Sequence, residues 1–190
     1  MISLALLLLQ ACSPPYLYTD GEEAPWEAPS NQWYVGDVPG DLKEEGFRVG
    51  EVPRDFRVPD QFGDSVSLWQ FYGQVVLVDI STLWCAPCQD LAEEAEETYQ
   101  EYRGAGFVYV TLLPEDLEYE VPSQEDLMLW VDRFELTAPV LSDDVEWAEP
   151  LVPSGGFPRL ILIGRDMRVI DPEIYPITDA RIRELVDAHL

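Results

Sequence analysis

The sequence predicts an α/β fold in which helices flank a central mixed β-sheet and a β-hairpin precedes that sheet. Two observations carry this prediction: short apolar runs rich in β-branched residues alternate with amphipathic helical segments, and the last two strand-like runs follow each other directly. Strands joined by a helix run parallel and strands joined by a tight turn run antiparallel, so we expect both arrangements in one sheet. A chain of 190 residues is long enough for one domain with one sizeable core.

The first expected elements are a hairpin and two buried strands. Asp55 to Val58 and Ser65 to Leu68 alternate in polarity, and Gly63-Asp64 supplies turn residues between them. Val75 to Ile80 is a nearly continuous apolar run rich in β-branched residues, and Phe107 to Leu113 is a second such run. We therefore expect both runs inside the sheet, the first of them at its centre.

Three helices are expected. After Cys88, apolar and small residues recur at helical spacing until Gly104, while carboxylates occupy the other face. This apolar set comprises Leu91, Ala95, Thr98, Tyr99 and Tyr102. Ser123 is expected to cap a helix that ends at Phe134, and Thr178 is expected to cap a final helix. The apolar face of the final helix holds Ile182, Leu185 and Val186.

A second hairpin is expected between the last two helices. Leu160 to Ile163 predicts a third buried strand. The segment Gly164-Arg165-Asp166 then has the composition of a turn, and it leads directly into Arg168 to Ile170. This late hairpin is what makes the predicted sheet mixed.

The charge of the chain is strongly one-sided. It contains 37 Asp and Glu against 11 Lys and Arg, a formal net charge of -26, yet 47% of its residues are hydrophobic and 12% are aromatic. So apolar a chain is expected to fold, with its charges on the surface. A surface this acidic repels nucleic acid and anionic headgroups, so we exclude nucleic-acid binding. We expect a monomer.

Three cysteines are present, and they fall into two groups. Cys12 lies near the N-terminus, while Cys85 and Cys88 form a pair separated by two residues. A structural zinc site needs two groups of ligands, but beyond the pair only Cys12 and the single His189 remain. We expect neither a metal nor another cofactor.

The N-terminus resembles a bacterial lipoprotein signal. Ile2 to Leu9 is an apolar run too short to span a bilayer, and Leu9-Gln10-Ala11-Cys12 resembles a lipobox. The resemblance implies a signal peptide over residues 1–12 and a lipid on Cys12, which would anchor the protein in the bacterial envelope, facing the periplasm. Gln10 is larger than is usual, and no Lys or Arg precedes the run. An ordinary secretory signal with a spare thiol at Cys12 is the alternative, and it also exports the domain.

Residues 13–45 are expected to form a flexible tether to a domain over residues 46–190. The tether region is rich in Pro, Gly, Asp and Glu, and its apolar residues show no sustained strand-like or helix-like periodicity. Trp26, Trp33 and Tyr34 are unusual in a linker. Packing against the domain would explain them, but we favour chance composition.

The segment Trp84-Cys85-Ala86-Pro87-Cys88 lies where the central strand ends and the first helix begins. At such a place backbone N–H groups and the helix dipole stabilise a thiolate, which makes Cys85 the expected nucleophile. Cys88 is close enough in sequence to resolve a mixed disulfide. A purely structural disulfide is the alternative, but so small a loop contributes only about 2 kcal/mol, against about 3 for fifteen residues.

Val78-Asp79 through Cys88 resembles the active-site segment of thioredoxins. Val52 to Gln74 resembles the start of their envelope-anchored branch, the thioredoxin-like reductases related to cytochrome c maturation proteins and to the redoxin, AhpC/TSA-like group. The resemblance covers about Phe47 to the C-terminus and implies a thioredoxin fold. It also implies a thiol-disulfide oxidoreductase that exchanges its Cys-x-x-Cys pair with envelope proteins, acting as a reductant fed by a membrane electron donor. Pro87, inside the motif, supports this site.

The same resemblance implies roles for further residues. Asp79, six residues before Cys85, matches a buried carboxylate that takes a proton from the resolving Cys88; the alternative is a strand-end residue facing solvent. Pro158 matches a cis-proline that holds the substrate backbone, with Phe157 beside it, although proline at a strand entry is also merely permitted. Trp84 matches the tryptophan beside the nucleophile, or it only closes the core.

The chain departs from the thioredoxin pattern at two positions that affect substrate specificity. Glu93 stands where many relatives have a kinking proline, and Phe157 is bulkier than the residue usual before the cis-proline. A third departure concerns reactivity. No Lys, Arg or His occurs between Val58 and Tyr102, so the local sequence offers no cation to stabilise the Cys85 thiolate, and carboxylates oppose it. We expect a moderate thiol rather than a strong oxidant.

Two alternative functions stay open. Thr82-x-x-Cys85 resembles part of the motif of peroxiredoxin-like thiol peroxidases, although Val78 stands in place of their proline. A copper metallochaperone needs a three-residue gap between its cysteines and a histidine near them. This chain has a two-residue gap, and its only histidine is His189.

Overall fold

The computed structural model describes residues 26–152 and 156–190, and these residues form the predicted α/β fold. Five strands make a mixed sheet in the order β5-β4-β3-β6-β7. Strands β3, β4 and β5 are parallel, whereas β6 and β7 are antiparallel to their neighbours. Their bounds are Val75–Ile80 for β3, Phe107–Leu113 for β4, Val140–Ser142 for β5, Arg159–Ile163 for β6 and Val169–Asp171 for β7.

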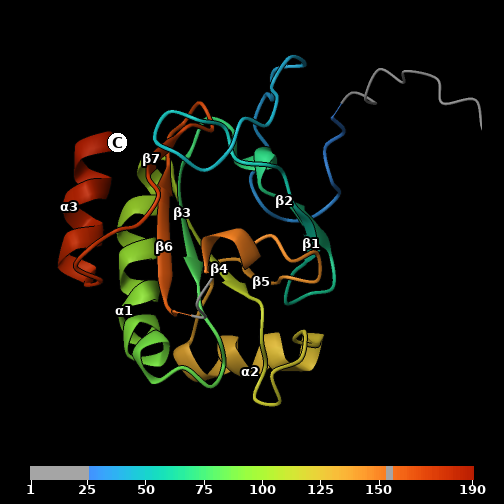
Figure 1. The fold of residues 1–190 in the computed structure, drawn as a ribbon, viewed down its shortest axis with the longest axis vertical. Helices are drawn as coiled ribbons and strands as arrows, with labels where there is room; N and C mark the ends of the chain where they lie inside the picture. The colour runs from blue at the N-terminus through green and yellow to red at the C-terminus, as the bar shows by residue number, and fades with distance from the viewer. Residues whose placement is uncertain (1–25, 153–155) are drawn as a thin grey trace, which may run out of the picture.

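The helices and the hairpin are also found near their predicted places. The α-helices of the described part are α1 at Ala86–Tyr102, α2 at Gln124–Phe134 and α3 at Asp179–His189, and short 3-10 turns lie at Trp69–Phe71, Arg103–Ala105 and Glu149–Leu151. Strands β1 and β2, Arg57–Pro59 and Ser65–Ser67, form a separate antiparallel hairpin. Figure 1 shows α1 and α3 side by side on one face of the sheet, with α2 across its end.

The two helix caps predicted from sequence are confirmed. The side chain of Ser123 accepts from the backbone N–H of Asp126, and the Asp126 carboxylate accepts in return from the Ser123 N–H, which completes a capping box. Thr178 accepts from the N–H of Arg181 at the start of α3. Each cap satisfies an N–H group that would otherwise lack a partner.

The sheet separates two hydrophobic cores, which explains why its central strands are apolar throughout. Val75 and Leu77 of β3 face the core under α1 and α3, while Val76, Val78 and Ile80 face the other. All residues of β3 and β4 are buried. A strand covered on both faces gives a continuous apolar run rather than an alternation, as the sequence predicted.

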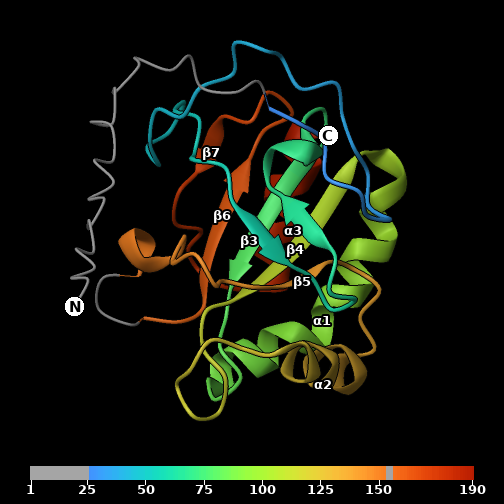
Figure 2. The same ribbon diagram turned by 90° about the vertical axis from the view of Figure 1, so that its right-hand side faces the viewer.

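The second face is covered by aromatic side chains from loops and from the N-terminal part of the chain. Figure 2, turned by 90°, shows the β1–β2 hairpin in front of the sheet and α3 behind it. Trp147 is fully buried there and makes edge contacts with Phe47 at 5.1 Å and Phe56 at 5.4 Å between ring centroids. Its indole N–H donates to the carbonyl oxygen of Arg54 at 2.8 Å, so this large side chain leaves no polar atom without a partner.

The expected tether differs from the structure over residues 26–45, which follow the surface of the domain. Trp26 Nε1 donates to Ser67 Oγ at 3.1 Å, and Trp33 Nε1 donates to Asp60 Oδ2 at 2.7 Å. The interpretation of these tryptophans as chance composition is therefore wrong: each pairs its apolar ring with a polar anchor on the domain. Residues 13–25 lie outside the described residues.

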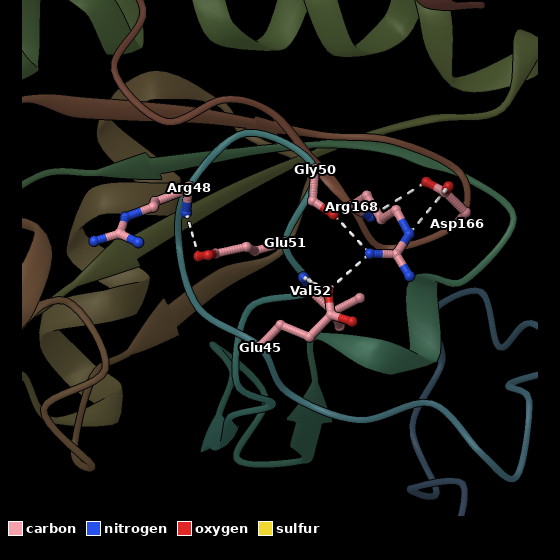
Figure 3. A network of polar contacts seen from close by, with 7 residues as sticks. All are labelled: Glu45, Arg48, Gly50, Glu51, Val52, Asp166 and Arg168. Carbon is pink, nitrogen blue, oxygen red and sulfur yellow. Dashed lines mark hydrogen bonds and ion pairs between the residues drawn. The ribbon is translucent and has the colours of Figure 1, made fainter.

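Contacts continue across the expected boundary at residue 46. Arg168, next to β7, donates to Glu45 Oε2 at 2.7 Å and to the carbonyl oxygen of Gly50 at 2.6 Å, while Glu51 accepts from the backbone N–H of Arg48 (Figure 3). The Glu45–Arg168 ion pair is half exposed, so it fixes the path of the chain more than it stabilises the fold.

Strand β5 is the element that the sequence does not predict. It has only three residues and follows Pro139, so it shows no period of its own. Its pairing with β4 decides that it is a strand. None of the described helices is both long enough and apolar enough to cross a bilayer.

Candidate active site

The cysteine pair occupies the start of α1, as the sequence predicts. Cys85 is the N-cap residue, and its sulfur accepts from the backbone N–H of Cys88 at 3.3 Å. The N–H of Cys85 itself donates to the carbonyl oxygen of Thr82 at 3.2 Å. Pro87 lies in the first helical turn, where its missing N–H leaves no hydrogen bond unmade. The sulfur of Cys85 therefore sits at the positive end of the helix dipole.

A disulfide joins Cys85 and Cys88, with their Cα atoms 5.2 Å apart. Cys85 retains 4% exposure, whereas Cys88 is fully buried. An attacking thiol must reach solvent or a docked partner, and of the two residues only Cys85 can do so. Among the described residues, no three His, Cys, Asp or Glu side chains gather where they could hold a metal ion.

Asp79 lies inside β3 and is fully buried, so the alternative of a solvent-facing residue does not hold. Ser81 Oγ donates to its Oδ1 at 2.6 Å, and the Tyr109 hydroxyl donates to its Oδ2 at 3.1 Å. Burial raises the pKa of Asp79 from 3.8 to about 6, and these two hydrogen bonds offset part of the rise. Tyr109, which bonds this carboxyl group, belongs to the same hydrophobic core as Cys88.

Trp84 and Phe157 form an aromatic wall beside the disulfide. Trp84 is 37% exposed, contacts Phe157 edge-on with ring centroids 5.9 Å apart, and lies 5.4 Å from the ring of Tyr119. Its Nε1 donates to Glu115 Oε2 at 2.8 Å. Trp84 therefore does more than close the core. The Phe157–Pro158 peptide bond is cis, the geometry that the resemblance implies at this loop.

A groove of about 680 Å³ runs from the cysteine motif along α1. Pro87, which lies between the two cysteines in sequence, lines the groove together with Pro158, and the first turn of α3 also lines it. The groove brings together two segments that are 70 residues apart in sequence and that the resemblance singled out separately. An extended polypeptide could lie in it with a sulfur atom next to Cys85.

The sequence predicts carboxylates but no cation near Cys85. The charges along the groove agree with this prediction, whereas a cation lies on the side of α2. Among the residues that the structure describes, the side chains that line the groove include carboxylates and no cation. However, Arg133 of α2 donates to Gln89 Oε1 at 2.9 Å, and Gln89 also donates to the carbonyl oxygen of Leu83. The cation comes from a helix that begins almost forty residues after the motif, so the local sequence could not reveal it.

Three polar partners at this site were not predicted: Ser81, Tyr109 and Glu115. Ser81 could have been noticed, because it follows Asp79 by two residues and short side chains often bond at that spacing. Tyr109 and Glu115 come from β4 and the loop after it, and only strand pairing brings them close. Glu93 is exposed on α1, and Cys12 lies outside the described residues.

Replacing Asp79 by Asn should stabilise the oxidised protein at about pH 7.5, by about 2 to 3 kcal/mol. Between pH 3.8 and about 6 the folded protein holds a proton on Asp79 that the unfolded chain has released. Stability therefore falls as pH rises through this window, and the cost is complete above it. Urea unfolding of Asp79→Asn and the unchanged protein should differ at about pH 7.5 and converge near pH 4. An equal difference at both pH values would contradict this account, and Asp41→Asn, at an exposed residue, is the control.

Comparison with known proteins identifies the family. Residues 49–151, more than half of the chain, match the AhpC/TSA family. The thiol-disulfide oxidoreductase ResA of Bacillus thuringiensis subsp. konkukian is 26% identical over 131 residues, which cover 67% of this chain and 70% of that protein. The thioredoxin-like protein YneN of Bacillus subtilis is 26% identical over 101 residues, covering 53% of this chain and 57% of that protein.

Solved structures agree on the fold. The thioredoxin domain of a thiol-disulfide oxidoreductase from Bacteroides vulgatus superposes with a TM-score of 0.62 at 22% identity, covering 74% of this chain and 96% of that one. A thioredoxin family thiol:disulfide interchange protein from Chlorobium tepidum gives 0.62 at 16% identity, with 75% and 97% covered. The predicted thioredoxin fold is thus confirmed, and the relatives confirm the predicted thioredoxin-like oxidoreductase. The chain belongs to the AhpC/TSA family.

Proposed function

We propose that this protein reduces disulfides in other exported proteins, with Cys85 as the attacking thiol and Cys88 as the resolving thiol. The observation that carries the proposal is the position of Cys85. It caps α1, it keeps the only exposure of the pair, and it precedes by two residues Pro87, which lines the groove together with Pro158. This arrangement combines a stabilised thiolate with room for a polypeptide substrate.

The reaction proceeds in two exchanges. The Cys85 thiolate attacks one sulfur of the client disulfide, which forms a mixed disulfide and releases the other client sulfur as a thiolate that takes up a proton. Cys88 then loses its proton and attacks the sulfur of Cys85, which forms the Cys85–Cys88 disulfide and releases the second client thiol. Two electrons pass from the protein to the client, and an upstream dithiol donor in the membrane restores the reduced pair.

Asp79 is proposed to accept the proton of Cys88 in the second exchange. A pKa of about 6 leaves its carboxylate ionised at neutral pH yet basic enough to take a proton from a thiol that is becoming a nucleophile. Tyr109 and Ser81 hold both carboxylate oxygens, which fixes the side chain. The fully buried Cys88 has little access to water as an alternative base.

Changing Cys88 to Ala should trap the reaction at the mixed disulfide, because no thiol remains to resolve it. Mixing this variant, reduced, with a neutral peptide disulfide should give a covalent adduct through Cys85, visible in the intact mass. The matched variant Cys85→Ala should form little adduct, since Cys88 is buried. Adduct formation through Cys88 instead would reverse the proposed roles.

The direction of electron flow is decided by the reduction potential. None of the described residues that line the groove is basic, so we expect the Cys85 thiolate to lack the strong stabilisation that makes a dithiol an oxidant. Equilibration of the domain with glutathione or thioredoxin should therefore give a potential near that of thioredoxin, about -270 mV. A value near about -120 mV would mean that the protein introduces disulfides rather than reducing them.

The location of His189 argues against the copper-chaperone alternative. His189 is the last residue of α3, and the neighbouring Leu190 accepts through its carbonyl oxygen from Arg165, which also bonds Gly73 just before β3. The histidine is therefore near the amino end of β3, whereas the cysteine pair follows its carboxyl end, at the opposite end of the sheet (Figure 1). The peroxidase alternative is less well supported than disulfide exchange, although the AhpC/TSA family model matches the chain. The matching relatives are named thiol-disulfide oxidoreductase and thioredoxin-like protein, and Val78 stands in place of the peroxidase proline.

We also propose that the domain is exported and held at the envelope membrane by a lipid on Cys12, after removal of residues 1–11. The support is the lipobox-like Leu9-Gln10-Ala11-Cys12. Full-length protein expressed in a bacterium should sediment with membranes, and Cys12→Ala should appear in the soluble fraction. An ordinary secretory signal would instead leave both forms soluble.

A further inference from the structure

We propose that the groove beside the disulfide binds a client segment that carries lysine or arginine next to its cysteine. This inference rests on the proposed function, because it names the client of the same site. It follows from three features of the described residues: the shape of the groove, its unpaired carboxylates, and the aromatic and acidic surface around Trp84.

The groove is shaped for an extended chain. It opens at Pro87 and the cis-linked Pro158, and then passes between Leu91 of α1 and Ile177 before α3. Ile177 is partly exposed, so the groove offers apolar surface that a bound chain would cover. A client cysteine next to Cys85 would direct its neighbouring residues along this path.

Two carboxylates along the groove lack a cation. Asp90 and Glu94 lie four residues apart on α1, which puts them on the same helix face one turn from each other. Neither takes part in any ion pair among the described residues. The third groove carboxylate, Asp179, is already paired with Arg183 and accepts from Thr98. Asp90 and Glu94 therefore remain free for a partner.

The surface around Trp84, which contacts the groove residue Phe157, is likewise aromatic and acidic. Tyr119 and Trp84 lie 5.4 Å apart there, and their rings could contact a cationic side chain. The loop of residues 114–122 that carries Tyr119 also supplies Glu115 and the exposed Glu118 and Glu120. The cation Arg133 bonds Gln89 and does not line the groove.

The charge of the groove then indicates which kind of client segment it binds. An acidic client would bring like charges next to Asp90 and Glu94 in a protein of net charge -26, whereas a basic one would pair with both. Partly exposed pairs of this kind contribute about 0.2 to 1 kcal/mol each, so two of them change a rate by about two- to thirtyfold. The groove therefore contributes preference among clients, while the cysteine pair supplies the chemistry.

The test uses three short peptides of equal length, each with one cysteine held in a disulfide with neutral 2-mercaptoethanol. The cysteine is flanked by lysines, glutamines or glutamates. Reduced protein is mixed with each peptide, and the rate is followed by tryptophan fluorescence, since Trp84 directly precedes Cys85 in the chain. We expect the lysine peptide to react about tenfold faster than the glutamate peptide, and this ratio to fall to about threefold or less in Asp90→Asn/Glu94→Gln.

The control is Asp41→Asn/Glu44→Gln, which removes the same charge from exposed positions outside the groove. It should leave the lysine-to-glutamate ratio unchanged, because the ratio then reflects the local carboxylates and not the net charge. Equal rates for the three peptides, or the same fall in ratio in both double variants, would overturn the docking proposal and leave the reductase intact. Failure to reduce any of the peptides would instead overturn the proposed function.

Discussion

The structure depends on the burial of strand β3 on both of its faces. Every residue from Val75 to Ile80 is buried, and successive apolar side chains enter opposite cores. Pairing with β4 on one edge and with β6 on the other then fixes the register of β3 in the sheet. Because Cys85 follows the end of this strand by five residues, the position of β3 determines where the reactive sulfur emerges and where α1 begins.

Asp79 is the one ionisable residue in this apolar strand, and its burial lowers the stability of the fold. A buried carboxylate loses hydration, and the hydrogen bonds from Ser81 and Tyr109 compensate only in part, since its pKa is still raised to about 6. An apolar residue would fit the strand without this cost. A buried side chain that destabilises the fold, on the strand that leads to the cysteine pair, is explained by a chemical role, which is why we propose that it accepts the proton of Cys88.

The sequence predicted the strands and helix caps that depend on residues close together in the chain. The bounds of β3 and β4 agree with the apolar runs, and the caps at Ser123 and Thr178 follow from hydrogen bonds between residues three apart. In contrast, β5 depends on pairing with β4, and the wall that Tyr119 adds beside Trp84 depends on how the loop after β4 folds back. The cysteine motif could thus be located from sequence, but the polar and aromatic residues around it could not.

The charges around the disulfide act on Cys85 in opposite directions. The start of α1 stabilises a thiolate, while the carboxylates of the groove and of the loop beside Trp84 oppose its formation in the free protein. A client that carries a cation into the groove offsets those carboxylates at the moment when its disulfide lies against Cys85. The acidic surroundings therefore do more than oppose the thiolate, because in the proposed complex they also give the site a preference for clients of the opposite charge.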